Sequence, residues 1–261
     1  MRSKTTTSFR SGRMTWVVPA ALIALSLIPV IAGAARLTQL TGGATVTPEN
    51  ARFFASPLPV ITHIVTVTVY SLLGAFQFVP PLRRVPGLRR GRRSWHEISG
   101  RILVPAGLLA GLSGLWMSVF YTLPETDGEA LLVLRLIFGT AMVGGIILGI
   151  LAIRRRDFAA HGAWMTRAYA IALGAGTQAL VLLPWILVVG PTDETTRAVL
   201  MGASWVINLV VAEYAIRRRH AAPGRGTRPA GRGTRPAGRG TRPAGRVPTP
   251  ATTTAGHRSV P

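Results

Sequence analysis

Residues 130–152, ALLVLRLIFGTAMVGGIILGILA, form an apolar run that contains one charged residue, Arg135. An α-helix of about 20 apolar residues crosses the hydrocarbon layer of a bilayer, so this run predicts a transmembrane helix. Five further runs share its length and composition, and they lie near 15–35, 59–80, 102–121, 165–189 and 198–216. None alternates polar and apolar residues as barrel strands do. The sequence therefore predicts an all-α, polytopic membrane helix bundle with six transmembrane helices.

The composition agrees with a membrane protein whose natural solvent is the lipid bilayer. Hydrophobic residues make up 48% of the chain and charged residues only 15%, which is too little polar surface for a soluble globule of this length. Cysteine is absent, which excludes disulfides, thiolate metal sites and a cysteine nucleophile. We find no catalytic triad, phosphate loop or carboxylate pair, so the sequence gives no support to a hydrolase or a transferase.

The basic residues predict the orientation of the bundle. Of the 30 Lys and Arg residues, 26 fall in the two terminal segments and on every second loop, whereas the alternate loops contain only Arg36, Arg52 and Arg197. Since positive residues are retained on the cytoplasmic side, we expect a multi-pass protein of the cell membrane with both termini in the cytoplasm. The net charge of +21 then follows from topology, and its distribution argues against nucleic-acid binding.

Three regions follow from these runs: a cytoplasmic N-terminal segment (1–14), a six-helix transmembrane domain (15–219) and a tail rich in Arg, Gly and Pro (220–261). The tail contains three identical copies of Gly-Arg-Gly-Thr-Arg-Pro-Ala, and such a composition is expected to be disordered. One interpretation is a tether to anionic lipid head groups. The other is a neutral repeat expansion on a permissive terminus.

The first span has a second interpretation as a secretory signal. Basic residues precede it, and Ala32-Gly33-Ala34 is similar to a cleavage site. Its apolar core is longer than a typical signal core, which favours a retained helix. Cleavage would leave five spans in an unchanged orientation.

Polar residues recur every three or four positions on the second span: His63, Thr66, Tyr70 and Gln77. They share one helix face, which is expected to point into the bundle. Such a face either lines a polar cavity for a proton, a quinone or a small solute, or forms hydrogen bonds between helices.

Two charged residues of the spans have local interpretations. Arg135 is expected to reach towards Asp127 or Glu129. Alternatively, it lies at the depth of His63 and forms with it a cationic outer pocket for an anionic group. Glu213 and Arg217 have the spacing of an ion pair at a helix end.

Histidine suggests a cofactor, because His96 and His161 both lie on the predicted cytoplasmic side, before the third and fifth spans. Two histidines at equal depth on different helices are what one b-type haem requires. Against haem, both lie a turn or more outside the apolar runs, and histidines that merely bond loops are the alternative.

Several motifs resemble a bacterial family of predicted membrane proteins, domain of unknown function 2306. They are Gly74-Ala-Phe-Gln-Phe78, Trp95-His-Glu-Ile-Ser-Gly-Arg101 and, as the most specific, His161-Gly-Ala-Trp-Met-Thr-Arg167. The resemblance covers about residues 50–215. It implies a multi-helix bundle and supplies no reaction. Its matched polar positions are His63, Gln77, His96, Arg101, His161, Arg167 and Glu213.

Two classes of function remain open from the sequence. The first is a non-enzymatic membrane protein, either a small-solute carrier or a structural and assembly component, with a polar cavity along the second helix. The candidate residues of this cavity are His63, Thr66, Tyr70, Gln77, Arg135, Arg167 and Glu213. The second is a membrane electron-transfer protein with one haem b between His96 and His161.

Overall fold

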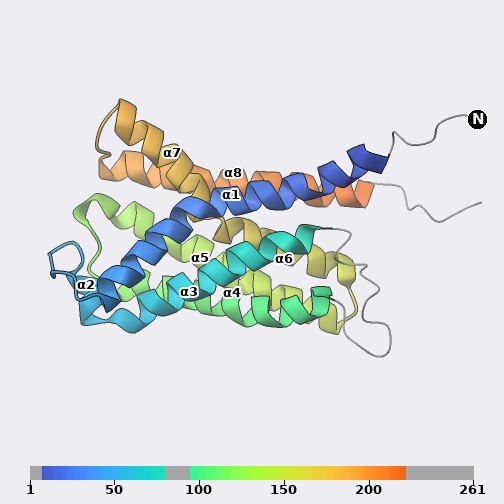
Figure 1. Cartoon of the computed structure of the whole chain (residues 1–261), viewed down its shortest axis with the longest axis horizontal. Coiled ribbons are helices and arrows are strands. Elements are labelled where there is room, and N and C mark those ends of the chain that lie inside the picture. The colour runs from blue at the N-terminus through green and yellow to red at the C-terminus, as the bar shows by residue number, and fades with distance from the viewer. Residues whose placement is uncertain (1–7, 80–94, 222–261) are drawn as a thin grey trace, which may run out of the picture. The chain divides into compact units, whose positions relative to one another are not determined.

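The computed structural model describes residues 8–79 and 95–221, and every regular element in this part of the chain is helical (Figure 1). In chain order the elements are α1 (Ser8–Thr41), α2 (Ala51–Ala55), α3 (Pro57–Ala75), the 3-10 turn η1 (Phe76–Phe78), α4 (Trp95–Phe120), the 3-10 turn η4 (Glu125–Asp127), α5 (Glu129–Arg154), α6 (Phe158–Ala172), α7 (Gly174–Val188) and α8 (Glu194–Ala221). Residues 222–261, which include the repeats of the tail, lie outside the described residues.

Six stretches of this part are long and apolar enough to cross a membrane, which confirms the predicted all-α bundle. They are Trp16–Thr41, Pro57–Phe78, Trp95–Phe120, Glu129–Arg154, Phe158–Val188 and Glu194–Arg219. Most extend beyond the apolar runs, because a helix satisfies its own backbone hydrogen bonds and can continue into the polar interface. Consequently His96 and His161, expected outside the spans, lie in the first turns of α4 and α6.

The spans alternate in direction, so their connections gather at two ends of the bundle. We call one the Asp127 end, where loops 42–56, 121–128 and 189–193 lie, and the other the His161 end, where α4, α6 and the described part of α1 begin. The loop 42–56 contains the short helix α2.

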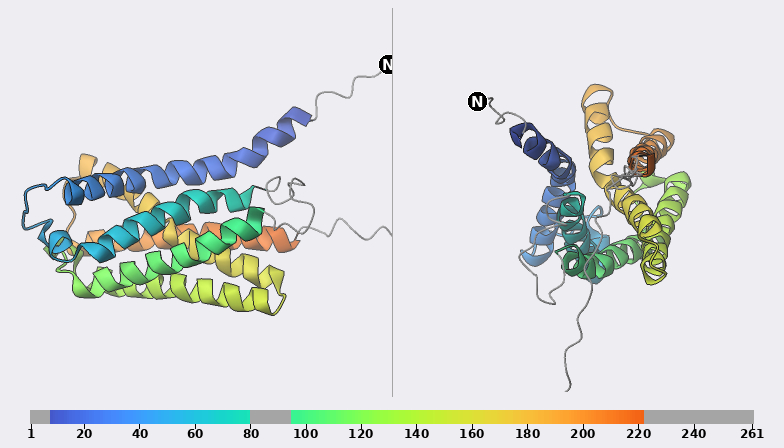
Figure 2. Two further views of the ribbon diagram at one scale, coloured as in Figure 1. Left: turned by 60° about the horizontal axis from the view of Figure 1, so that its bottom comes forward. Right: turned by 90° about the vertical axis from the view of Figure 1, so that its right-hand side faces the viewer.

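The helices pack as a closed ring. Contacts between elements follow the order α1, α3, α4, α5, α8, α7 and back to α1. Figure 2 (right) shows these helices nearly end-on. Glycines permit the closest approaches. A Cβ added at Gly107 of α4 would lie 2.6 Å from the Tyr70 ring of α3, and one at Gly176 of α7 would lie 2.2 Å from the carbonyl oxygen of Leu25 in α1. These positions therefore require glycine for packing.

The fifth span is broken in its middle, at Leu173. Its first half, α6, lies deep in the bundle, where Ala168 and Tyr169 are buried against α3, α4 and α5. Its second half, α7, lies at the periphery and buries only Gly174, Gly176 and Gln178. Figure 1 shows that α7 changes direction relative to α6 and slants outward at the Asp127 end.

Side chains of α8 stabilise this break. Asn208 donates from Nδ2 to the carbonyl oxygen of Ala170 at 3.1 Å, and it accepts a hydrogen bond of 2.8 Å from the Thr177 hydroxyl. One amide therefore joins both halves of the broken span, as backbone groups released within a membrane require. Beside it, a Cβ added at Gly174 would lie 2.2 Å from Nε1 of Trp205, so the indole ring fills the angle between α6 and α7.

Candidate functional site

A cavity of about 460 Å³ occupies the ring at the Asp127 end. Helices α1, α3, α4, α5, α7 and α8 all contribute to its wall, and Leu173 and Gly176, at the break in the fifth span, line it as well. The volume lies within the range of about 300–1,000 Å³ that is typical of small-molecule sites. The wall is mostly apolar, with its charged residues, Arg52, Asp127 and Arg135, at the Asp127 end.

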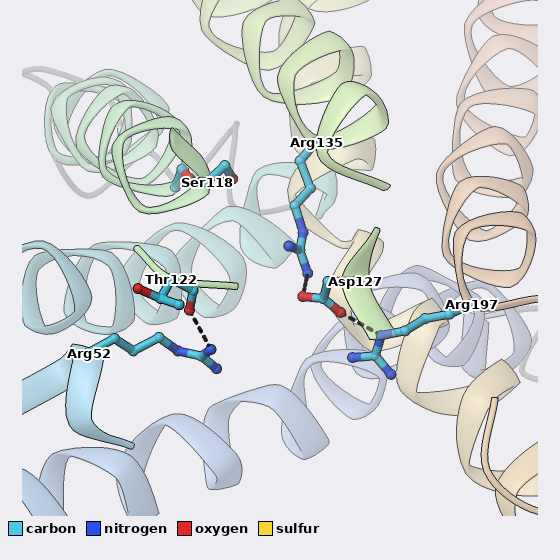
Figure 3. Close-up of polar contacts among 7 residues, drawn as sticks. Arg52, Ser118, Thr122, Asp127, Arg135 and Arg197 are labelled. Atoms are coloured by element: carbon cyan, nitrogen blue, oxygen red, sulfur yellow. Dashed lines mark hydrogen bonds and ion pairs between the residues drawn. The ribbon is translucent and has the colours of Figure 1, made fainter. Parts of the chain in front are cut away.

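Asp127 is the centre of the charge network at this end (Figure 3). Its side chain is only 4% exposed, and each carboxylate oxygen accepts a hydrogen bond of 2.7 Å from one arginine, Oδ2 from Arg135 of α5 and Oδ1 from Arg197 of α8. The pair with Arg135 confirms one of the two expected partners of that arginine. One carboxylate therefore joins η4, α5 and α8, and it carries less charge than the two cations that share it.

The ionisation of Asp127 follows from these contacts. Burial by itself would raise the pKa of its carboxyl group. The hydrogen bonds and positive charges of Arg135 and Arg197 outweigh burial, so the pKa lies below its ordinary value. Asp127 is therefore ionised at neutral pH.

Arg52 of α2 is, with Arg135, one of the two cations of the cavity wall (Figure 3). Its Nη1 donates to the carbonyl oxygen of Thr122 at 2.9 Å, and its guanidinium lies 4.7 Å from the ring centroid of Phe53. None of the ion pairs within residues 8–79 and 95–221 involves Arg52. Burial lowers the pKa of Arg52, and although Asp127 raises it, Arg36 and Arg135 lower it further. The arginine thus lies in a confined environment, near charges of both signs.

His63 lines the same cavity, at the level of α4 residues 110–114. Its Nδ1 donates to the carbonyl oxygen of Ala110 at 2.9 Å and lies 3.3 Å from the Ser113 hydroxyl. A Cβ added at Gly114 would lie 3.2 Å from the imidazole Cε1, so glycine provides the room for the ring. Because Nδ1 carries the proton in this arrangement, Nε2 of the neutral ring is an acceptor. Arg135 and His63, which we expected at similar depth, share one cavity wall.

The other residues of the predicted polar face, Thr66, Tyr70 and Gln77, do not line this cavity. The Thr66 hydroxyl donates to the carbonyl oxygen of Thr62 within its own helix, at 2.6 Å. Tyr70 is 4% exposed and packs with the Tyr169 ring at a centroid distance of 5.7 Å. The α3 residues on the wall are instead His63, Ile64, Val67, Thr68 and Ser71.

Gln77 contributes to a polar cluster at the His161 end. It donates from Nε2 to the Ser99 hydroxyl at 2.5 Å, and its Oε1 accepts a hydrogen bond from Nδ1 of His96. This contact joins η1 to the first turn of α4. His161 belongs to a different network, because its Nδ1 donates to the carbonyl oxygen of Gly149 in α5 at 2.8 Å.

The haem hypothesis for His96 and His161 stays a prediction, and an absorption spectrum tests it. A Soret band of detergent-purified protein, lost in His96→Ala and in His161→Ala, would support haem. A featureless spectrum from cells supplied with haem would exclude it.

Arg167 and Glu213 form an ion pair between α6 and α8. The distance from Arg167 Nε to Glu213 Oε1 is 2.5 Å, and Nη2 lies 3.2 Å from Oε2. Glu213 thus pairs with Arg167 across the bundle, whereas the pair with Arg217 expected from spacing is not among the ion pairs of the described residues. Arg167 belongs to α6, a different helix from that of Glu213, so residue spacing along α8 cannot predict this contact. Neither Arg167 nor Glu213 lines the cavity at the Asp127 end.

The place of Arg52 and of two further residues in the cavity wall was not predicted from the sequence. Arg52 is one of three arginines on the sparsely charged loops, and that scarcity was the available signal. Thr68 and Ser71 line the wall because the part of α3 that faces the cavity is turned away from Thr66 and Tyr70. No pattern of polar residues distinguishes these two faces.

Comparison with known proteins gives one result. No curated protein matches the chain. No solved structure matches it either. A family model described as a predicted membrane protein matches residues 60–216, which include most of α3, all of α4 to α7 and most of α8. The chain therefore belongs to the family of predicted membrane proteins known as DUF2306.

Proposed function

We propose that this membrane protein is a carrier, which binds a small solute in the cavity at its Asp127 end. The observation that carries the proposal is the cavity itself, whose wall includes residues of all six spans and of the break at Leu173. Small-molecule sites are typically concave and mostly apolar, with a few polar groups that fix the ligand. This cavity has that character.

The broken fifth span supports a carrier rather than a fixed scaffold. Binding sites of secondary transporters are often formed by discontinuous helices near the middle of the bilayer. Here α6 and α7 meet at one residue, and α7 is a largely exposed helix with few buried side chains. A hinge requires only a few residues that absorb the change in backbone angles. A movement of α7 about Leu173 would change the cavity while α6 stays in place.

The basic residues support an orientation in which the Asp127 end faces the outside of the cell. In this orientation the cavity receives its solute from the outside. Release on the cytoplasmic side requires a second conformation, in which the floor of the cavity near Ser71 becomes accessible from the His161 end.

The absence of cysteine allows a direct test, because each single-cysteine variant contains one thiol. Ser71 lines the cavity, whereas Ser204 is fully buried outside it. We expect Ser71→Cys to react with a small membrane-impermeant anionic thiosulfonate in right-side-out vesicles and also in inverted vesicles, and Ser204→Cys to stay unreactive in both. Reaction of Ser71→Cys from one side only would contradict a carrier, and no reaction would contradict an accessible cavity.

A further inference from the structure

The charge at the open end of the cavity selects for an anion. The charged residues of the wall are Arg52, Asp127 and Arg135, and Asp127 also pairs with Arg197 behind it. Arg135 and Arg197 share the one negative charge of Asp127, and Arg52 adds a positive charge that belongs to none of the ion pairs of the described residues. Arg135 already forms an ion pair with Asp127, so Arg52 is the cation best placed to bind a ligand.

Arg52 has hydrogen-bonding capacity for such a ligand. A guanidinium carries five N–H donors in one plane, a geometry that suits carboxylates and phosphates. One bond goes to the carbonyl oxygen of Thr122, and the ring of Phe53 fixes the orientation of the group. An aromatic face on one side and a bonded carbonyl on the other leave a preorganised cation at the end of the cavity.

Away from this end, the wall is apolar. Val67, Leu115, Phe138, Met142, Ile171 and Trp205 line the part that extends towards the break in the fifth span. A small inorganic anion would leave this surface without a partner, whereas a hydrocarbon chain would fill it. The ligand thus needs a charged group at one end only.

The volume limits the length of this chain. If each heavy-atom group needs roughly 30 Å³, the liquid volume of one water, the cavity of about 460 Å³ holds about 15 groups. This is enough for one carboxylate with about a dozen carbon atoms. A phospholipid with two long chains has several times as many groups.

We propose that the solute is a single-chain amphiphilic anion, a carboxylate or phosphate on a hydrocarbon chain, whose head group binds Arg52. The proposal rests on the carrier function above and names its substrate class. The chain occupies the apolar wall towards Leu173, and the network around Asp127 fixes the shape of the open end.

Binding of radiolabelled dodecanoate and dodecyl phosphate to the full chain in phosphatidylcholine nanodiscs tests this proposal, with empty discs as background. The matched control is Arg36→Gln, since Arg36 lies 4.4 Å from the same Phe53 ring but does not line the cavity. We expect Arg52→Gln to weaken binding at least tenfold, a typical loss for one hydrogen bond to a charged group. Arg36→Gln should change it less than twofold, and Arg52→Lys should restore part of the loss.

Three results would overturn the proposal: unchanged affinity in Arg52→Gln, equal binding of uncharged dodecanol, or displacement by two-chain phosphatidylglycerol in the disc. Tighter binding of dodecanoate or of dodecyl phosphate supports it and identifies the head group. The two proposals fail separately. If the Ser71→Cys thiol reacts from both sides but neither anion binds, only the substrate class is wrong. If an anion binds but the thiol reacts from one side, only the carrier function is wrong.

Discussion

Replacement of Asp127 by asparagine should destabilise the whole bundle, because this carboxylate joins η4 to α5 and α8. It accepts two hydrogen bonds of 2.7 Å from arginines. A hydrogen bond to a charged group contributes about 1.5–3 kcal/mol. The side chains of Arg135 and Arg197 are 21% and 26% exposed, so water replaces part of each lost contact. We therefore expect Asp127→Asn to lower the free energy of unfolding at pH 7 by about 3 kcal/mol, less than the two contributions at their upper limit.

The assay is reversible unfolding in mixed micelles, with increasing sodium dodecyl sulfate and helix content as the signal. Glu125→Gln is the matched control, because Glu125 lies on the same 3-10 turn but is exposed. An exposed substitution of this kind should change the free energy of unfolding by less than about 0.5 kcal/mol. Equal stability of Asp127→Asn and the wild type would refute the role of the network.

The effect of Asp127→Asn on the free energy of unfolding should depend on pH. The pKa of Asp127 is lower in the folded protein than its ordinary value of 3.8. Its contribution to stability is therefore complete above pH 4 and is lost as the pH falls through the folded pKa. The difference between wild type and Asp127→Asn should shrink below pH 4, and a constant difference would contradict this explanation.

Two further experiments test the break and the ion pair. Gly174→Ala should destabilise by about 1–3 kcal/mol because its Cβ would overlap the neighbouring indole ring, whereas Gly144→Ala, with no atom within 4 Å of the added Cβ, should be neutral or slightly stabilising in the same unfolding assay. A double-mutant cycle should give a coupling energy of up to about 1 kcal/mol between Arg167 and Glu213, which are 30% and 34% exposed, and a smaller one between Glu213 and Arg217.

The number and the positions of the membrane-spanning helices were predictable, because the length and apolar composition of a run determine whether it can cross a membrane. Runs such as 130–152 are too long and apolar for anything but a membrane helix, and the structure contains a span at each of the six predicted places. The break at Leu173 was not predictable in this way. Residues 165–189 form one continuous apolar run, and the side chains that stabilise the break, Asn208 and Trp205, belong to another helix.

The site was predictable only in part, for a geometric reason. Sequence spacing places His63, Thr66 and Tyr70 on one broad face of α3, and that face does point into the bundle. The surroundings of α3 change along its length, however. His63 lines the cavity, whereas Tyr70 packs against the Tyr169 ring of α6. Contacts between distant helices, such as that of Arg167 with Glu213, leave no periodic signal in either segment.

The central claim is that the cavity at the Asp127 end is open to a solute, and two neighbouring threonines of α3 test it most directly. Thr68 lines the cavity, whereas Thr66, two residues earlier on the same helix, does not. In right-side-out vesicles we predict that an impermeant anionic thiosulfonate modifies Thr68→Cys at least tenfold faster than Thr66→Cys. Equal rates, or faster reaction of Thr66→Cys, would contradict the claim.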